Sequence, residues 1–281
     1  MTDLSIIIVS YNAREDLERC LTSLHNPAPA IAHEIIVVDN ASRDASADSA
    51  RRWPNVRVID SGSNRGFAAG NNIGIRASRG TALLLLNSDT VVPAGAIDRL
   101  VEVSRRRPQA AVVGPRLVDP SGRAELSFGP MVAPLAEWRQ KRLIVGLTNG
   151  DSGISQRVEQ MTRHEQLPDW VSGACLLVSR ADADSVGLLD ERYFMYLEDV
   201  DFCAALRARG RQILFTPEVE IVHVRGRSRA SAPEATEAAY RRSQVAFYEK
   251  HHPGLAPFLR LYLRLRGIKL EERPDARLAN P

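Results

Sequence analysis

Short apolar runs alternate with amphipathic segments along the first part of the chain. The runs are rich in β-branched residues or leucine and end in polar turn residues, which predicts buried strands at 4–10, 34–38, 56–59, 83–86 and 110–113. Apolar residues at helical spacing predict helices at 13–25, 45–52, from the glycine-rich stretch 64–72 to about 79, and from Pro93 to 107. This alternation predicts an α/β fold with a mostly parallel sheet covered by helices on both faces.

The pattern weakens between Pro120 and Pro168, where Gly, Pro and polar residues are scattered and only 136–145 has helical character. Beyond it we expect strands at 170–178, 213–216 and 220–224, and helices at 201–208 and 233–251. The segment 258–268 mixes Leu, Phe and Tyr with arginine and predicts an amphipathic basic helix. Such a helix suits a membrane surface, but equally suits packing on the domain with a solvated basic face.

Charge is unevenly spread although the net charge is only +3. From Arg225 to the end there are 12 Lys/Arg and 6 Asp/Glu, so this tail is basic and the rest slightly acidic. A basic tail indicates an anionic partner, either a membrane or a nucleic acid. Because the tail lacks stacking aromatic side chains interleaved with its basic residues beyond Tyr262, nucleic acid is the weaker alternative.

The three cysteines, Cys20, Cys175 and Cys203, are far apart and have no zinc-site spacing. Each lies in an apolar pattern, so we expect buried free thiols in a reducing compartment. Neither a signal peptide nor an apolar stretch of membrane-spanning length is visible. We therefore expect a cytoplasmic protein, which could bind peripherally to the inner face of the cell membrane.

Polar residues follow four of the expected strands, at the edge where open α/β sheets bind their ligands. Tyr11 could stack on a base, Asp39 could accept hydrogen bonds from a base or ribose, and Arg65 with the glycine-rich stretch could meet a diphosphate. Each alone would also suit a turn or a packing position, but together they favour a nucleotide site. The residues concerned are Ser10, Tyr11, Asn12, Asp39, Arg65, Gly70, Asn71, Ser88 and Asp89. Since neither GxGxxG nor GxxxxGK[ST] is present, a dehydrogenase or P-loop ATPase is disfavoured.

The second half of the chain carries a group of acids, namely Asp190, Glu191, Glu198, Asp199 and Asp201. Acids at a helix start are commonly caps, so some of them are expected to be structural. Those at 198–201 follow the aromatic run 193–196, and an apolar wall would raise a carboxyl pKa towards that of a usable general base. His223 ends an expected strand and is either structural or a metal ligand.

These motifs resemble a known family. The runs 5–12, 37–42, 64–72 and 85–90 are similar to the family-two inverting glycosyltransferases of the GT-A fold. Residues 170–177, 190–201 and 223–228 resemble the second half of the same enzymes, especially a rhamnosyltransferase-like subgroup, and the resemblance covers about Leu4 to Lys250. It implies one GT-A domain with a nucleotide-sugar-binding half at 1–115 and an acceptor-binding, catalytic half at 116–230, followed by a helical basic tail at 231–281.

The resemblance also implies roles for individual residues. Tyr11 and Asp39 would hold a pyrimidine base, with Arg65 nearby, and Asp89 would ligate Mg²⁺ or Mn²⁺ on the diphosphate. The sequence has Asn-Ser-Asp where the family often has Asp-x-Asp, which makes His223 more important as a second metal ligand. Asp199 would be the catalytic base. The acceptor pocket would be shaped by Trp170, Gly173 and Glu198.

The expected function is therefore metal-dependent, inverting transfer of a sugar, with rhamnose as one option. The donor would be linked to dTDP or UDP rather than GDP, and the acceptor would be a glycan or a polyprenyl-linked glycolipid. A nucleotidyltransferase is an alternative, but such an enzyme would need a Lys/Arg-rich phosphate loop early in the chain, and that region contains only Arg14 and Arg19. A non-catalytic nucleotide-sugar-binding protein is another. We expect no nucleic-acid partner, while a membrane partner and a homodimer stay open.

Overall fold

The computed structural model describes residues 2–224 and 233–268. Its centre is an eight-stranded sheet in the order β3-β2-β1-β4-β9-β6-β10-β5. The strands are β1 (Leu4–Ser10), β2 (His33–Asp39), β3 (Val56–Asp60), β4 (Ala82–Asn87), β5 (Thr90–Val91), β6 (Ala110–Val118), β9 (Cys175–Ser179) and β10 (Gln212–His223). Only β9 and β5 run against the others. The predicted, mostly parallel sheet is thus confirmed.

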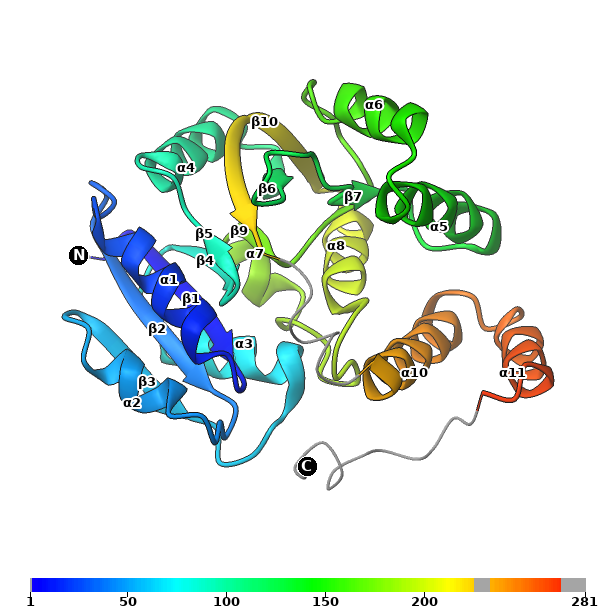
Figure 1. Cartoon of the computed structure of the whole chain (residues 1–281), viewed down its shortest axis with the longest axis horizontal. Coiled ribbons are helices and arrows are strands. Elements are labelled where there is room, and N and C mark those ends of the chain that lie inside the picture. The colour runs from blue at the N-terminus through cyan, green and yellow to red at the C-terminus, as the bar shows by residue number, and fades with distance from the viewer. Residues whose placement is uncertain (1, 225–232, 269–281) are drawn as a thin grey trace.

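Helices cover both faces of this sheet, as predicted (Figure 1). On one face lie α1 (Arg14–His25), α2 (Ser46–Arg51) and α4 (Ala96–Arg106), and on the other α3 (Gly66–Ala77), α7 (Arg180–Ser185) and α8 (Glu198–Ala208). The alternation of side chains along β1 explains the two layers. Ile6 and Ile8 pack in the core beneath α1, whereas Ile7 packs in the core with Phe202 of α8.

A group of peripheral helices lies beyond the second face, at the right of Figure 1. They are α5 (Pro134–Thr148), α6 (Ser152–Met161), α10 (Pro233–His251) and α11 (Ala256–Leu265). The α5 side chain of Glu137 accepts hydrogen bonds from Tyr240, Gln244 and Tyr248 of α10. Lys250 of α10 donates to acids of the 190–201 segment. These polar contacts fix α10 between α5 and the segment that contains the predicted base.

The sequence pattern misplaces several boundaries. The expected strand 170–178 is divided into β8 (Trp170–Val171), which pairs with β7 (Phe128–Gly129) in a separate sheet, and β9, because 172–174 turns the chain. The two strands expected at 213–216 and 220–224 form the single strand β10, which has a register shift between them. Helix α4 begins at Ala96, so Pro93 precedes it.

Other expectations hold. All three cysteines are buried free thiols, and burial raises the pKa of Cys20 to about 12. The segment 120–168, which gave no clear pattern, contributes β7, α5 and α6. The last part of the 223–228 motif, residues 225–228, and the charged tail after 268 lie outside the described residues. Across the described ranges, no helix combines the length and apolar character needed to cross a bilayer.

Candidate active site

The carboxyl ends of the first four parallel strands are level with one another. Ser10 of β1 is paired with Asp39 of β2, which is paired with Asp60 of β3, and Val9 is paired with Asn87 of β4. The antiparallel strand β9 starts at this same edge, where the Asn87 N–H donates to the carbonyl that precedes Cys175. The prediction that these loops share one sheet edge is therefore confirmed.

An open hollow of about 470 Å³ lies beside the end of β2, and Asp39 is among its lining residues. The Asp39 side chain is only 3% exposed, and its Oδ2 accepts a hydrogen bond from the Ser42 N–H at 3.0 Å. Its Oδ1 is buried and has no hydrogen-bond partner within the described residues. Burying an unsatisfied carboxylate oxygen is costly, so an incoming N–H or O–H donor would be favoured here. The hollow is lined by Asp39, Ala41, Ser42, Arg43, Ala45, Ala47, Asp48, Arg51 and Asp60.

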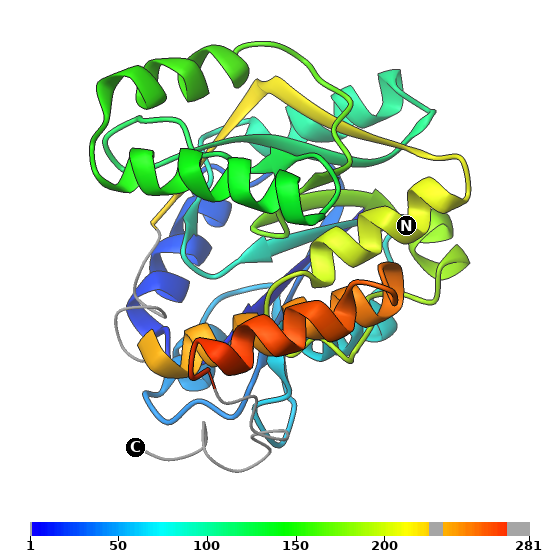
Figure 2. The same ribbon diagram turned by 90° about the vertical axis from the view of Figure 1, so that its right-hand side faces the viewer.

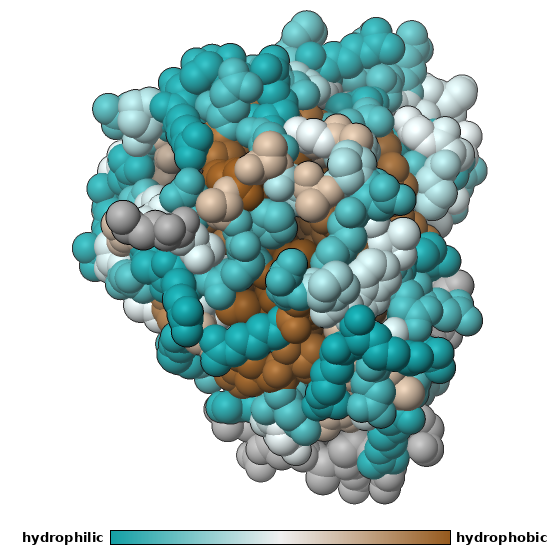
Figure 3. Space-filling model, turned by 90° about the vertical axis from the view of Figure 1, so that its left-hand side faces the viewer, coloured by the Kyte–Doolittle hydropathy of each residue, from teal (hydrophilic) through white to brown (hydrophobic). Residues whose placement is uncertain are grey.

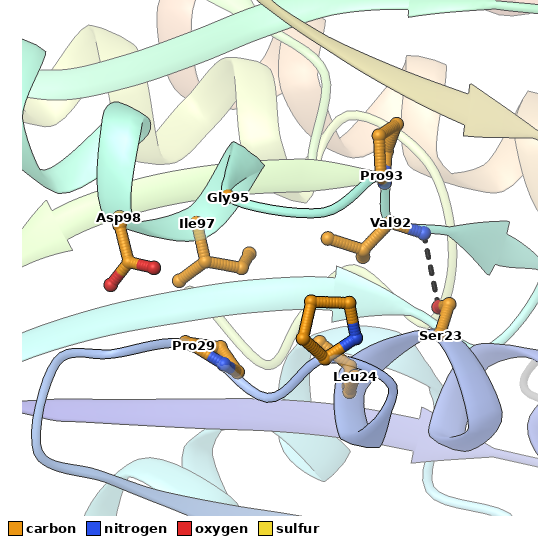
Figure 4. A pocket seen from close by; sticks show the side chains of 9 residues that line it. Ser23, Leu24, Pro29, Val92, Pro93, Gly95, Ile97 and Asp98 are labelled. Carbon is orange, nitrogen blue, oxygen red and sulfur yellow. Dashed lines mark hydrogen bonds between the residues drawn. The ribbon is translucent and has the colours of Figure 1, made fainter.

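A second cavity, between the end of α1 and the start of α4, is not a nucleotide site. Ser23 accepts a hydrogen bond there from the Val92 N–H at 3.0 Å, beside Pro29 and Asp98 (Figure 4). Its volume of about 10 Å³ has room for little more than one water molecule.

The loops that follow β1 and β2 are held together by hydrogen bonds. Asn12 has a left-handed backbone with φ 49°, its N–H donates to Ser42 Oγ at 2.9 Å, and its Oδ1 accepts from the Arg43 N–H at 2.8 Å. Tyr11 is half-buried in this arrangement, and the neighbouring Ser10 Oγ is buried with no partner among the described residues. The loop backbone is thus fixed, while base stacking on Tyr11 stays a prediction.

The predicted glycine-rich loop is a helix from Gly66 onward. Gly66 has φ +82°, and a Cβ there would stand 2.1 Å from the carbonyl oxygen of Phe194, so no other residue fits. Gly70 and Asn71 lie inside α3, where a Cβ on Gly70 would be 2.8 Å from a methyl group of Val9. Gly70 therefore allows close packing of α3 on β1. Binding of phosphate by these residues stays a prediction.

Arg65, the residue before α3, is paired with an acid. Its Nη2 lies 3.8 Å from Glu191 Oε2, and Glu191 also accepts hydrogen bonds from Asn72 and Arg76. These contacts lower the pKa of Glu191, the hydrogen bond from Asn72 most of all. Because the Arg65 side chain is about half exposed, it can still turn towards a ligand at the sheet edge.

Pairing of two distant strands brings the two predicted metal ligands together. The short strand β5, which follows the turn at Ser88, pairs antiparallel with the end of β10, so that Thr90 is opposite His223. His223 Nε2 consequently lies 3.3 Å from Asp89 Oδ1. On its other side, His223 Nδ1 lies 3.0 Å from Oε2 of the buried residue Glu125.

Electrostatics favour a charged ring at this position. Burial would lower the pKa of His223, but hydrogen bonds to Asp89 and Glu125 outweigh it and raise the pKa to about 9. No group of three or more His, Cys, Asp or Glu side chains within 2–224 and 233–268 is arranged to hold a metal ion. Once the ring loses its proton, His223 would offer a neutral imidazole beside the carboxylate of Asp89. That is a suitable partial set for a cation whose other ligands are phosphate oxygens and water.

Glu125 was missed by the sequence analysis, and so was Ser127, whose buried Oγ has no partner in the described part of the chain. The signal that could have found them is the alternation of apolar and polar residues at 124–128, which is typical of a strand with one polar face.

The predicted base, Asp199, lies in the first turn of α8 and is hydrogen-bonded to the turn that precedes β9. Its Oδ2 accepts a hydrogen bond from the Gly173 N–H at 2.8 Å, and its Oδ1 accepts from the Val200 N–H at 2.8 Å. A Cβ on Gly173 would lie 3.2 Å from the ring of Phe67 and 3.4 Å from the Asp199 Cβ. The start of α3, Gly173 and Asp199 therefore meet, so the predicted base lies beside the predicted donor half.

Burial raises the carboxyl pKa values at this position, as expected for acids beside the aromatic segment. Desolvation raises the pKa of Asp199, although the backbone N–H groups of Gly173, Val200 and Asp199 itself oppose it. The pKa of Glu198 is raised well above its usual range, first by burial and then by the charge of Asp199. Glu198 Oε2 is buried without a partner in the described residues. The indole N–H of Trp170 already donates to the Pro130 carbonyl at 2.9 Å, so any contact with an acceptor would come from the ring.

Solved structures, one of them of a mannosyltransferase, share this fold. A mannosyltransferase from Pyrobaculum calidifontis, in complex with GDP-Man and Mn²⁺, superposes with a TM-score of 0.62 at 17% identity, over 92% of this chain and 70% of that one. Residues 1–349 of S. aureus TarS superpose with a TM-score of 0.56 at 17% identity, over 88% of this chain and 66% of that one. At this identity the likeness concerns the fold alone, which is of the GT-A type.

Sequence comparison is more specific. The family model for glycosyl transferase family 2 matches residues 5–153. An N-acetylglucosaminyl-diphospho-decaprenol L-rhamnosyltransferase of Mycobacterium tuberculosis is 31% identical over 90% of this chain and 87% of its own length. The low-salt glycan biosynthesis hexosyltransferase Agl10 of Haloferax volcanii is 28% identical over 79% of this chain and 67% of its own.

Fold and sequence together define a glycosyltransferase. The chain belongs to glycosyl transferase family 2, within its rhamnosyltransferase-like subgroup.

Proposed function

We propose that this enzyme transfers a sugar, with inversion at the anomeric carbon, from a dTDP- or UDP-linked donor to a polyprenyl-linked glycan. The observation that carries the proposal is the convergence of three unlike groups at one sheet edge. They are the unpaired oxygen of Asp39, the adjacent pair Asp89 and His223, and the anchored carboxylate of Asp199.

The donor would bind along the carboxyl ends of β1 to β4. Asp39 Oδ1 would accept a hydrogen bond from a pyrimidine N–H, with Tyr11 and Arg65 beside it. Asp89 and His223 would hold Mg²⁺ or Mn²⁺, with His223 in its neutral form. When bound, the cation would act as a Lewis acid that offsets negative charge on the departing diphosphate.

The acceptor hydroxyl would approach from the side of α8. Asp199 would take its proton while the hydroxyl oxygen forms a bond to the anomeric carbon and the bond to the diphosphate breaks. The raised pKa of Asp199 supports this role because it makes the carboxylate a stronger base than an exposed aspartate. The anchoring hydrogen bond from Gly173 would keep the carboxylate oriented towards the acceptor.

Rhamnose as the transferred sugar, and a lipid-linked acceptor, are suggested by the mycobacterial relative that covers nine-tenths of the chain. An acceptor of that kind resides in a membrane, so we also propose peripheral association with the inner face of the cell membrane. The division into a donor half at 1–115, an acceptor half at 116–230 and a basic tail at 231–281 is part of the same proposal.

Calorimetry with UDP, dTDP and GDP, each with and without Mn²⁺, tests the donor site. Binding of dTDP or UDP that strengthens with Mn²⁺ is expected, and dTDP would point to rhamnose. Folded protein that binds none of the three nucleotides would contradict the proposal. Nucleotide binding without turnover on any lipid-linked acceptor would instead favour a non-catalytic binding protein.

Glu125 is expected to act on the cation site through His223. Because a carboxylate on the far ring nitrogen orients a ligating histidine and raises its basicity, Glu125→Gln should weaken Mn²⁺ binding about tenfold or more. Titration of Mn²⁺ by calorimetry in the presence of the bound nucleotide measures this without turnover. Glu220→Gln is the matched control, since Glu220 lies on β10 as well but pairs with Arg116. Equal Mn²⁺ affinity in the two variants would show that Glu125 has no such role.

A further inference from the structure

Exposed large apolar side chains are concentrated on two helices. Of the ten such residues in the described ranges, all but Leu167 lie on α5, on α11 or directly before α11. They are Leu135, Trp138, Ile144, Val145, Leu255, Phe258, Leu261, Tyr262 and Leu265. Both helices lie on the same side of the molecule, which faces the viewer in Figure 2. The opposite side is hydrophilic around its rim and has an apolar region down its centre (Figure 3), but apart from Leu167 none of the ten exposed large apolar residues of the described chain lies outside α5, α11 and the residue before α11.

Helix α11 has two apolar faces. Ala256 and Leu263 are buried against the domain. Phe258, Tyr262 and Leu265 follow one another at helical spacing and are 70%, 51% and 78% exposed. Packing on the domain, which the sequence left as an alternative to membrane binding, therefore accounts for only one of these faces. A solvent-facing stripe of this kind is unusual for a soluble protein and marks an interaction surface.

Helix α5 carries a similar stripe. Leu135, Trp138, Arg142 and Val145 recur at helical spacing and are all exposed, and the Arg142 guanidinium lies 5.1 Å from the centre of the Trp138 ring. The single acid of this helix, Glu137, is turned towards α10, to which it is hydrogen-bonded. The exposed part of α5 is thus apolar and basic.

Apart from Glu137, which is turned towards α10, the charged residues of both helices are basic. Helix α11 contains no acid and two arginines, of which Arg260 pairs with Glu249 of α10 and Arg264 pairs with no acid of the described residues. Arg266 follows directly, with its guanidinium 5.9 Å from the centre of the Tyr262 ring. Exposed arginine and lysine residues also lie on α5, at 139, 141 and 142. Apolar side chains flanked by arginine and lysine are complementary to the interface of an anionic bilayer, where apolar groups enter the acyl boundary and cations meet lipid phosphates.

We propose that α5 and α11 form a docking surface for an anionic phospholipid bilayer. This proposal rests on the proposed function, because a lipid-linked acceptor is what would require the enzyme to dock on a membrane. Helix α5 lies close to the predicted acceptor pocket, because Gln140 of α5 and the ring of Trp170 both border Gly129. Docking through α5 would therefore bring the predicted acceptor side of the site to the membrane surface.

Co-sedimentation of the full chain with vesicles tests the surface. We expect binding to vesicles of equimolar phosphatidylcholine and phosphatidylglycerol, weak binding to phosphatidylcholine alone, and weakening by salt. The double variant Phe258→Ser/Leu265→Ser should bind the anionic vesicles about tenfold more weakly or worse, since each side chain gives up apolar burial. Trp138→Ser should also weaken binding. Leu167→Ser removes an exposed leucine outside both helices and should change nothing.

Three results would overturn the proposal: no binding to anionic vesicles, equal binding by the double variant, or equal binding to neutral vesicles. Sedimentation analysis tests whether a second copy of the chain occupies this surface instead. If the unaltered chain were a dimer that did not bind vesicles, and the double variant were a monomer, α5 and α11 would form a contact between two copies of the chain. The vesicle assay contains neither donor nor acceptor, so it stands apart from the proposed activity. Conversely, the surface variants should keep nucleotide binding and transfer to a water-soluble acceptor analogue.

Discussion

Asp199→Asn is expected to lower kcat about a thousandfold, the middle of the range for loss of a general base. Asparagine has the same shape and can still accept the hydrogen bond from the Gly173 N–H, but it cannot take the proton of the acceptor hydroxyl. Nucleotide affinity should be unchanged, because the site of the base lies apart from the hollow beside Asp39. Steady-state transfer rates and calorimetric binding of the nucleotide, measured on the same preparation, check both parts.

Glu198→Gln is the matched control for this experiment. Glu198 is the neighbouring buried acid, and its proposed role is to shape the acceptor pocket, so its loss should act mainly on the KM for acceptor. If Asp199→Asn retained most of its turnover while Glu198→Gln lost it, the base would have to be reassigned to Glu198. The raised pKa of Glu198 makes this a real alternative outcome.

Asp89→Asn should lower kcat/KM about a hundredfold or more, because a Lewis acid contributes several kcal/mol to stabilising the leaving group. An amide is a much weaker ligand than a carboxylate for Mg²⁺ or Mn²⁺. The Mn²⁺-dependent part of nucleotide binding should disappear, while the metal-independent part should stay. Calorimetry with and without Mn²⁺ separates the two.

Asp48→Asn is a suitable control for Asp89→Asn, since Asp48 is an exposed acid that lines the nucleotide hollow away from His223. It should leave the effect of Mn²⁺ intact. If nucleotide binding by both variants responded to Mn²⁺ as that of the unaltered chain does, Asp89 would not be a metal ligand. The diphosphate would then have to be bound by other groups at the carboxyl ends of the strands.

The sheet was predictable because its signals are local. Each parallel strand is a short, nearly continuous apolar run that ends in a polar turn, as in 83–90. Parallel strands place those turns at one edge, so Asp39 and Asp89 could be assigned to a common site without coordinates. The turn at 172–174 and the continuity of β10 were not predictable, because whether an apolar run bends or continues depends on which strands its two halves pair with.

Contacts that depend on distant pairing could not be derived. The alternation at 124–128 could have marked Glu125 as part of a polar face, but its proximity to His223 depends on the fold of the whole second half. The need for glycine at position 66 arises from the carbonyl of Phe194, far along the chain. The outward stripe on α11 likewise required knowledge of which face packs inward, since its apolar residues nearly surround the helix.

The pairing of β5 with the end of β10 has a thermodynamic consequence. Asp89 and His223 come from distant parts of the chain, and they are adjacent only while the outermost pair of strands is closed. A ligand that bridges the two side chains binds only molecules in which β5 is paired with β10. By linkage, such a ligand lowers the population of molecules in which this pair of strands has separated. Substrate concentration in the cell would then set both the occupancy of the site and the fraction of molecules in which β5 is paired with β10.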